Sequence, residues 1–266
     1  MGTSTKIEWS DYVWNPLAGC ARVSPGCDHC YAAVMARRLG FMAEADLAAG
    51  RDPGQKRKYI GITNKNNAGR IMFNGRVNLD DSAIDEPLRW KKPRRVFVNS
   101  MSDLFHKDVP DDFILNVFRV MERTPQHTHQ VLTKRPERMA EWVGQRYRNN
   151  PHIGPASNIW LGTSVENQEQ ADARIPHLLA TPAHVRFLSC EPLLGPVNLR
   201  SIPIDERTRA DVVAGAYIYT GAISGSKHTS AARIQWVIVG GESGPGARPM
   251  HPDWAHWLRN QCSTDG

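Results

Sequence analysis

The amino-acid sequence predicts an α/β protein built on parallel strands, arranged as an open sheet or closed into a barrel. Short apolar segments alternate along the chain with amphipathic stretches of helical length. The apolar segments are nearly continuous in hydrophobicity, which is typical of strands that are covered on both faces. Six segments fit this description: 12–15, 95–100, 129–134, 159–164, 185–190 and 235–241.

Each predicted strand is followed by a stretch that suits a helix. Residues 110–124 carry an apolar stripe at helical spacing and begin with a proline and two aspartates, which favour a first turn. The other predicted helices cover about 29–49, 135–147, 167–180 and 251–262. Pro176 falls inside one of them, and we expect it to kink or split that helix.

The alternation of strands and helices predicts one domain over residues 1–266, interrupted by insertions at about 50–93 and 197–233. Within the first insertion, residues 69–79 have the pattern of a β-hairpin, with Asn74 and Gly75 as turn residues. The second insertion is rich in Gly, Ser and Ala around 214–232, which predicts a surface excursion.

The composition is that of an ordinary globular protein, with 41% hydrophobic and 23% charged residues. No apolar run has the length of a membrane span, and the start lacks the apolar core of a signal peptide. We therefore expect a cytoplasmic protein without a membrane partner. The net charge of +6 and the basic runs at 56–58 and 91–95 permit an anionic partner such as a nucleic acid.

Polar residues gather directly after the predicted strands. Because ligands of parallel α/β folds bind at the carboxyl ends of the strands, we expect a polar ligand at this rim. Some of these side chains also suit the simpler role of capping the next helix. The candidate binding residues are Ser100, Ser102, Asp103, Lys134, Arg135, Ser164, Glu166, Glu191 and Glu242.

Three of the five cysteines, Cys20, Cys27 and Cys30, have the spacing C-x6-C-x2-C directly after the first predicted strand. Three thiolates from one loop suit a 4Fe–4S cluster whose fourth iron stays open for a ligand. The alternative is zinc, with a fourth ligand from His29, His106 or Cys190. The position of the loop at the presumed binding rim favours the cluster. Cys190 and Cys262 are predicted to be buried, inert thiols.

A three-cysteine loop after the first strand of a six-unit βα chain resembles the radical S-adenosylmethionine superfamily. More closely, the chain resembles the phage-associated three-cysteine-motif family, whose function is uncharacterised. The segments that carry this resemblance are "EWSDYVWNPLAGC", "GCDHCYA", "VFVNSMSDLFH", "VLTKRPERM", "WLGTSVEN", "FLSCEPLLGP" and "VIVGGESGPGARPMHPDW".

The resemblance implies a partial (β/α)6 TIM-like barrel with a 4Fe–4S cluster on Cys20, Cys27 and Cys30. It also implies S-adenosyl-L-methionine as co-substrate, a 5′-deoxyadenosyl radical that abstracts hydrogen, and a reductant protein such as a flavodoxin or ferredoxin. The substrate is open, and the phage association and the basic charge point to a nucleic acid or nucleotide.

The chain departs from the superfamily pattern in several places. The first cysteine interval is six instead of three residues, and "GGE" follows the sixth strand instead of the second. We therefore expect Asp103 to meet the methionine amino group, and Lys134 or Arg135 the carboxylate. Relatives continue past the last helix with another apolar segment, whereas the sequence of this chain stops at "QCSTDG". Two alternatives stay open: a zinc-stabilised nucleic-acid-binding protein without catalysis, and a shortened, inactive relative.

Overall fold

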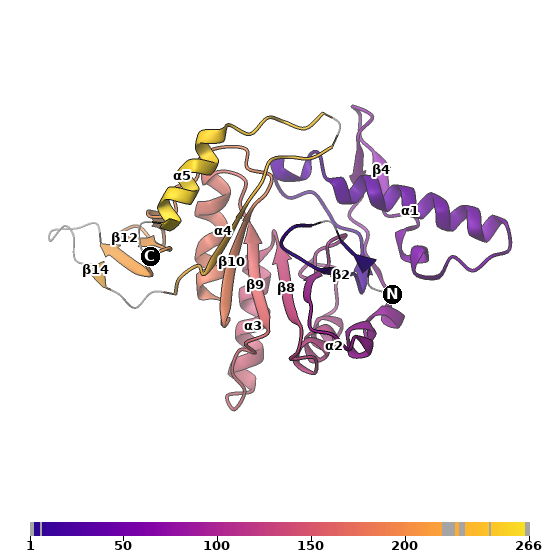
Figure 1. Cartoon of the computed structure of the whole chain (residues 1–266), viewed down its shortest axis with the longest axis horizontal. Coiled ribbons are helices and arrows are strands. Elements are labelled where there is room, and N and C mark those ends of the chain that lie inside the picture. The colour runs from indigo at the N-terminus through magenta and orange to yellow at the C-terminus, as the bar shows by residue number, and fades with distance from the viewer. Residues whose placement is uncertain (1–2, 6, 220–226, 229–231, 245, 264–266) are drawn as a thin grey trace. The chain divides into compact units, whose positions relative to one another are not determined.

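The computed structural model describes residues 3–5, 7–219, 227–228, 232–244 and 246–263. The chain divides into two compact units, which are described separately below (Figure 1). Unit 1 comprises Met1–Leu132 and Ala156–Ile159, and unit 2 comprises Thr133–Pro155 and Trp160–Gly266.

The α/β class predicted from the sequence is confirmed, with a central parallel sheet of six strands. The strand order is β1-β2-β7-β8-β9-β10-β15, and the short edge strand β1 (Thr3–Ser4) runs antiparallel to β2. The six strands are β2 (Tyr12–Trp14), β7 (Arg95–Val98), β8 (Thr128–Thr133), β9 (Ile159–Ser164), β10 (Val185–Cys190) and β15 (Trp236–Val239).

In unit 1, helix α2 (Asp111–Glu122) contributes much of the core. Its residues Ile114, Val117 and Met121 are fully buried, as the apolar stripe in the sequence predicts. Helix α1 (Tyr31–Ala48) packs against the short helix η2 (Gly54–Tyr59). The remaining short helices are η1 (Pro25–Cys27), η3 (Asp81–Ala83) and η4 (Glu86–Arg89).

The hairpin predicted over 69–79 is wrong. Strand β5 (Ile71–Phe73) pairs with β4 (Thr63–Lys65), and β6 (Asn78–Leu79) pairs with β3 (Leu17–Ala18). The backbone N–H of Asn74, a residue of the predicted turn, donates to the carbonyl of Ile62 at 3.1 Å, so this residue is bound to an earlier segment of the chain. Long-range partners therefore override the local turn signal.

In unit 2, helices α3 (Pro136–Asn149), α4 (Gln168–Ala180) and α5 (Pro252–Ser263) match the predicted ranges. A split at Pro176 is wrong, because α4 is continuous through it, and a kink there stays a prediction. Proline removes one helical hydrogen bond. The fully buried Ile175 and Leu178, on either side of the proline, hold the helix in place.

The second insertion adds an antiparallel sheet that the sequence did not predict. Its strands are β11 (Ile202–Pro203), β12 (Thr208–Asp211), β13 (Ala216–Tyr219) and β14 (Lys227–His228). Part of the Gly- and Ser-rich segment predicted here, 220–226 and 229–231, lies outside the described residues.

Candidate iron–sulfur and cofactor site

The cysteine loop of unit 1 runs from the end of β3 to the start of α1. Cys20 follows β3, Cys27 is the last residue of η1, and Cys30 is the N-cap residue of α1. All three side chains are half-buried, and in the described part of the chain none of them belongs to a disulfide. Three accessible thiols therefore come from a single loop.

Backbone contacts attach this loop to the residues that follow β7. The N–H of Gly19 donates to the carbonyl of Met101 at 3.3 Å, and Gly19 forms a parallel bridge with Ser102. Gly19 has φ +102°, and a Cβ there would lie 2.1 Å from the carbonyl oxygen of Arg76. Only glycine fits this close approach. The loop is thus attached at the carboxyl end of β7, where parallel α/β folds bind ligands.

The loop is suited to thiolate ligands in its chemistry. The first turn of α1 carries no acidic side chain, and the carboxylate of Asp28, between Cys27 and Cys30, is paired with Arg22 at 2.6 Å, so the positive end of the helix dipole favours thiolates here. No three Cys, His, Asp or Glu side chains converge on a metal position within the residues described. Cys20, Cys27 and Cys30 are among the residues described, so the loop supplies three thiols in sequence without bringing them to one common position.

The segment after β7 holds the second group of predicted site residues. The Ser100 hydroxyl bonds to the Asn15 amide at 3.2 Å, and the Ser102 hydroxyl donates to the carbonyl of Leu17 at 3.1 Å. Asp103 is 4% exposed, and its carboxylate accepts the N–H of Phe105 at 3.0 Å. The side chains of Ser100, Ser102 and Asp103 thus form hydrogen bonds that stabilise the local backbone of unit 1.

Asn99 is the residue of this segment that the sequence did not single out. It is the one non-glycine residue of the described chain with positive φ, at 63°. It is only 2% exposed, and neither polar atom of its amide has a hydrogen-bond partner among the residues that the structure describes. A buried amide without partners is costly, and strained backbone is common at functional sites. The sequence shows an asparagine at the end of this strand, but it does not reveal the positive φ of that residue.

The remaining predicted residues all lie in unit 2. Glu166 is buried and forms an ion pair with Arg174 at 2.9 Å; the same Arg174 donates to the carbonyl of the buried Ser164 at 2.7 Å. The Glu242 carboxylate is bound by Arg248, through both the guanidinium and the backbone N–H. Neither arginine partner was anticipated from the sequence, because no local pattern links the residues of each pair.

The other unit 2 candidates are more accessible. Lys134 and Arg135 are half-buried where β8 meets α3, and the N–H of Arg135 donates to the Thr133 hydroxyl at 2.8 Å. Glu191 is exposed, and its carboxylate lies over Gly240, where a Cβ would come within 2.9 Å of Oε1. Glu166 and Glu242 are more enclosed than these three residues, and each is neutralised by its arginine partner.

Two thiols outside the loop were predicted to be buried and inert. Cys190 is fully buried, and burial strongly raises the pKa of its thiol, so that prediction is confirmed. Cys262 is exposed on the last helix, so the prediction is wrong there.

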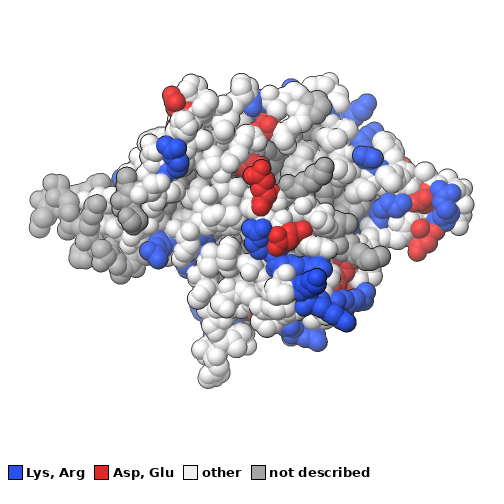
Figure 2. Space-filling model, viewed as in Figure 1, with Lys and Arg blue, Asp and Glu red and all other residues white. Residues whose placement is uncertain are grey.

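The surface charge is dispersed. Figure 2 shows the lysine and arginine side chains of one face in several separate groups, with acidic side chains among them. None of the helices in the described ranges is long and apolar enough to cross a lipid bilayer.

A family model described as "Protein of unknown function (DUF5131)" matches residues 4–266, nearly the whole chain. The chain belongs to the DUF5131 family. No match was found among curated proteins or among solved structures. The DUF5131 match spans both units and includes the cysteine loop, so the loop belongs to the family domain and is not an appendage to it.

Proposed function

We propose that this DUF5131 protein is a radical S-adenosylmethionine-type iron–sulfur enzyme related to the phage-associated three-cysteine-motif proteins. The observation that carries the proposal is the loop of three half-exposed thiols attached at the carboxyl end of β7. Cysteines this close in the sequence of a cytoplasmic protein, which we propose this to be, serve metals or catalysis. In this proposal the six parallel strands form the partial (β/α)6 barrel of that superfamily.

Cys20, Cys27 and Cys30 would hold a 4Fe–4S cluster, with the N-terminus of α1 favouring its negative charge. When bound, the cluster and S-adenosyl-L-methionine supply a 5′-deoxyadenosyl radical for hydrogen abstraction. In unit 1, the buried amide of Asn99, which has no hydrogen-bond partner among the described residues, is a candidate group for binding a polar ligand. In unit 2, Lys134, Arg135 and Glu191 stay predicted binding residues.

The protein's own contribution is binding, orientation and exclusion of water. An electron must come from outside the chain, so the proposal includes a reductant protein such as a flavodoxin or ferredoxin. The substrate class we propose is a nucleic acid or nucleotide, because the chain carries a net charge of +6.

Metal content of anaerobically purified protein tests the cluster. We expect a brown protein with about four irons per chain. Cys27→Ala should lose most of the iron while retaining the helical circular dichroism. Cys262→Ala is the matched control, because that thiol is exposed on α5, outside the loop. A colourless protein with one zinc, or full iron content in Cys27→Ala, would overturn the assignment.

The enzymatic part of the proposal has a separate readout. Iron-loaded protein is reduced with dithionite and mixed with S-adenosyl-L-methionine, and 5′-deoxyadenosine is measured by chromatography. We expect its formation in the wild type and in Cys262→Ala, and not in Cys27→Ala. A protein that binds the cluster but forms no 5′-deoxyadenosine would be an inactive relative that retains the fold.

A further inference from the structure

Helix α1 buries its small side chains. The face that packs inward consists of alanines and one glycine: Ala32, Ala33, Ala36, Gly40 and Ala43. A Cβ at Gly40 would lie 2.7 Å from the carbonyl oxygen of Tyr59, so the helix backbone approaches η2 directly. Leu39, which is partly buried, is the large apolar side chain of α1 that packs against the same core cluster.

Most of the large apolar side chains of α1 are exposed instead. Phe41 is 54% exposed and Val34 53% exposed. The other large apolar residues of this outer stripe, Tyr31, Met35 and Met42, are also exposed. An amphipathic helix of a globular protein normally shows the reverse arrangement, with its apolar stripe facing the core. An exposed apolar patch of this kind marks an interaction site.

The outer stripe has the spacing of a helix–helix seam. Tyr31, Val34, Arg38, Phe41 and Ala45 follow one another at intervals of three and four residues, the a and d positions of a heptad repeat. Arg38 occupies the centre of the stripe and makes no ion pair with any residue that the structure describes. None of the seam positions is a carboxylate.

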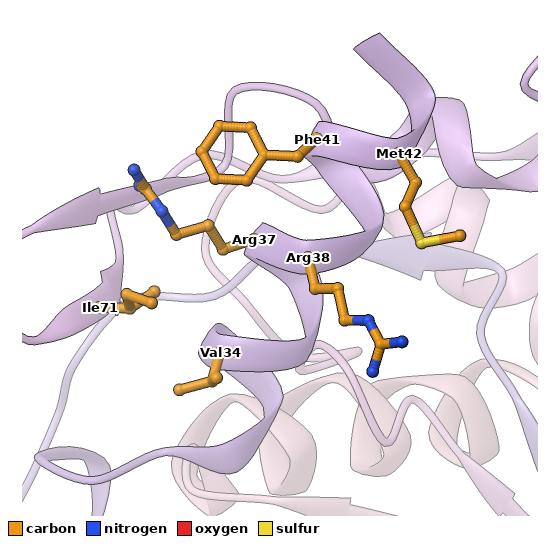
Figure 3. A pocket seen from close by; sticks show the side chains of 6 residues that line it. All are labelled: Val34, Arg37, Arg38, Phe41, Met42 and Ile71. Carbon is orange, nitrogen blue, oxygen red and sulfur yellow. The ribbon is translucent and has the colours of Figure 1, made fainter. Parts of the chain in front are cut away.

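The stripe is hollowed where it meets the neighbouring strand β5. An open pocket of about 400 Å³ is lined by Val34, Arg37, Arg38, Phe41, Met42 and Ile71. Figure 3 shows Val34, Arg37 and Phe41 on the side of the helix that faces Ile71, with Arg38 and Met42 on the other side. The Arg37 guanidinium lies 4.7 Å from the centre of the Phe41 ring, so this aromatic side chain is already positioned.

We propose that the outer stripe of α1 binds an amphipathic helix of another protein, whose own apolar seam carries a carboxylate opposite Arg38. Exposed Met, aromatic and Arg side chains with few other charges are the composition of a protein interface. A buried arginine at a seam position requires a partner charge. The geometry and the charge together specify an acidic amphipathic helix, independently of the enzymatic proposal.

Two other occupants fit less well. A second copy of the chain, paired through the same stripe about a two-fold axis, would bring two Arg38 side chains together without a carboxylate. A nucleic-acid surface is dominated by Lys and Arg along the backbone path, whereas this stripe has two arginines among five large apolar side chains. Both are outcomes that the test below distinguishes.

The test uses the full chain and two synthetic helices of three heptads. Both carry Leu at the a and d positions, except at the central a position, where one has Glu and the other Lys. We expect the Glu peptide to bind at least about tenfold more tightly in fluorescence anisotropy, because only Glu satisfies Arg38. Arg38→Glu should reverse this preference. Phe41→Asp should abolish binding of both peptides.

The matched control is Arg57→Glu, the same charge change at an exposed arginine of η2, which should leave the preference intact. Circular dichroism establishes that each variant is folded. Equal binding of the two peptides, a preference that survives Arg38→Glu, or no saturable binding below about 100 µM would overturn the proposal. The proposal would also be overturned if the wild type forms a dimer that Phe41→Asp disrupts. The same holds if the wild type binds a labelled single-stranded oligonucleotide and Phe41→Asp abolishes that binding.

Discussion

His129 of β8 is a fully buried histidine whose environment excludes its charged form. Its Nε2 lies 2.8 Å from Oγ1 of Thr124, and that hydroxyl donates to the carbonyl of Val120 at 2.8 Å. Nε2–H is therefore the donor to Thr124, and Nδ1 is the atom that would accept a further proton. Nδ1 is buried and has no hydrogen-bond partner in the described part of the chain. A charge there would be neither solvated nor paired.

Burial of the ring, with a smaller effect from the neighbouring His127, lowers the pKa of His129 from 6.5 to about 3. The unfolded chain keeps a pKa of about 6.5, so it binds a proton below that pH while the folded chain does not. Stability from this group is complete above pH 6.5 and is lost as the pH falls toward 3. Between pH 7.5 and pH 5 the linkage amounts to about 2 kcal/mol.

The measurement compares urea unfolding at pH 7.5 and pH 5 for the wild type and for His129→Gln. Gln retains a donor for Thr124 but does not titrate, so the variant should lose about 2 kcal/mol less than the wild type on acidification. His152→Gln, at an exposed histidine, should behave like the wild type. An NMR titration in which the His129 ring protonates near pH 6.5, or equal acid losses in wild type and His129→Gln, would refute the reasoning.

Two further substitutions test the local geometry of the site. Gly19→Ala should lower the free energy of unfolding in urea by more than about 2 kcal/mol, because its Cβ would meet a backbone carbonyl. Gly50→Ala, at φ +69° with nothing within 4 Å, should lower it by only about 1 kcal/mol. Equal losses in the two variants would contradict this account. Glu166→Gln should lower the free energy of unfolding by about 3–5 kcal/mol, because it leaves the Arg174 charge buried without its partner. Asp11→Asn, in an exposed ion pair, should lower it by less than about 1 kcal/mol. A similarly small loss in both variants would contradict the importance of the buried ion pair.

The sequence predicted the six parallel strands and five helices because both signals are local. Strands such as 159–164 are short and begin with a run of apolar residues, and α2 carries a clear stripe at helical spacing. The predictions that proved wrong depended on long-range partners. Asn74 and Gly75 have a turn signature, but their neighbours pair with strands on either side. Pro176 is a helix breaker by rule, but the packing of α4 overrides it.

The candidate site was predictable only in part for the same reason. The cysteine spacing is local, so the loop could be recognised from the sequence. The pairing of Glu166 with Arg174 and of Glu242 with Arg248 depends on side-chain positions that spacing does not reveal. The carboxylates at the strand ends therefore suggested ligand binding, whereas two of them are bound by arginines of their own unit. Asn99 was recognisable as polar, but its positive φ and its buried, unpartnered amide were not.

Helix α1 connects the two proposals physically. Its N-cap is Cys30, and its inner face consists of small residues because the backbone must approach η2 closely. Because its fully buried positions are Ala and Gly, most of the large apolar residues of the helix lie on the outside. The same packing that fixes the start of the helix beside the thiols thus creates the exposed stripe. A helix bound along that stripe would end next to the cysteine loop, where it could restrict solvent access to the thiols.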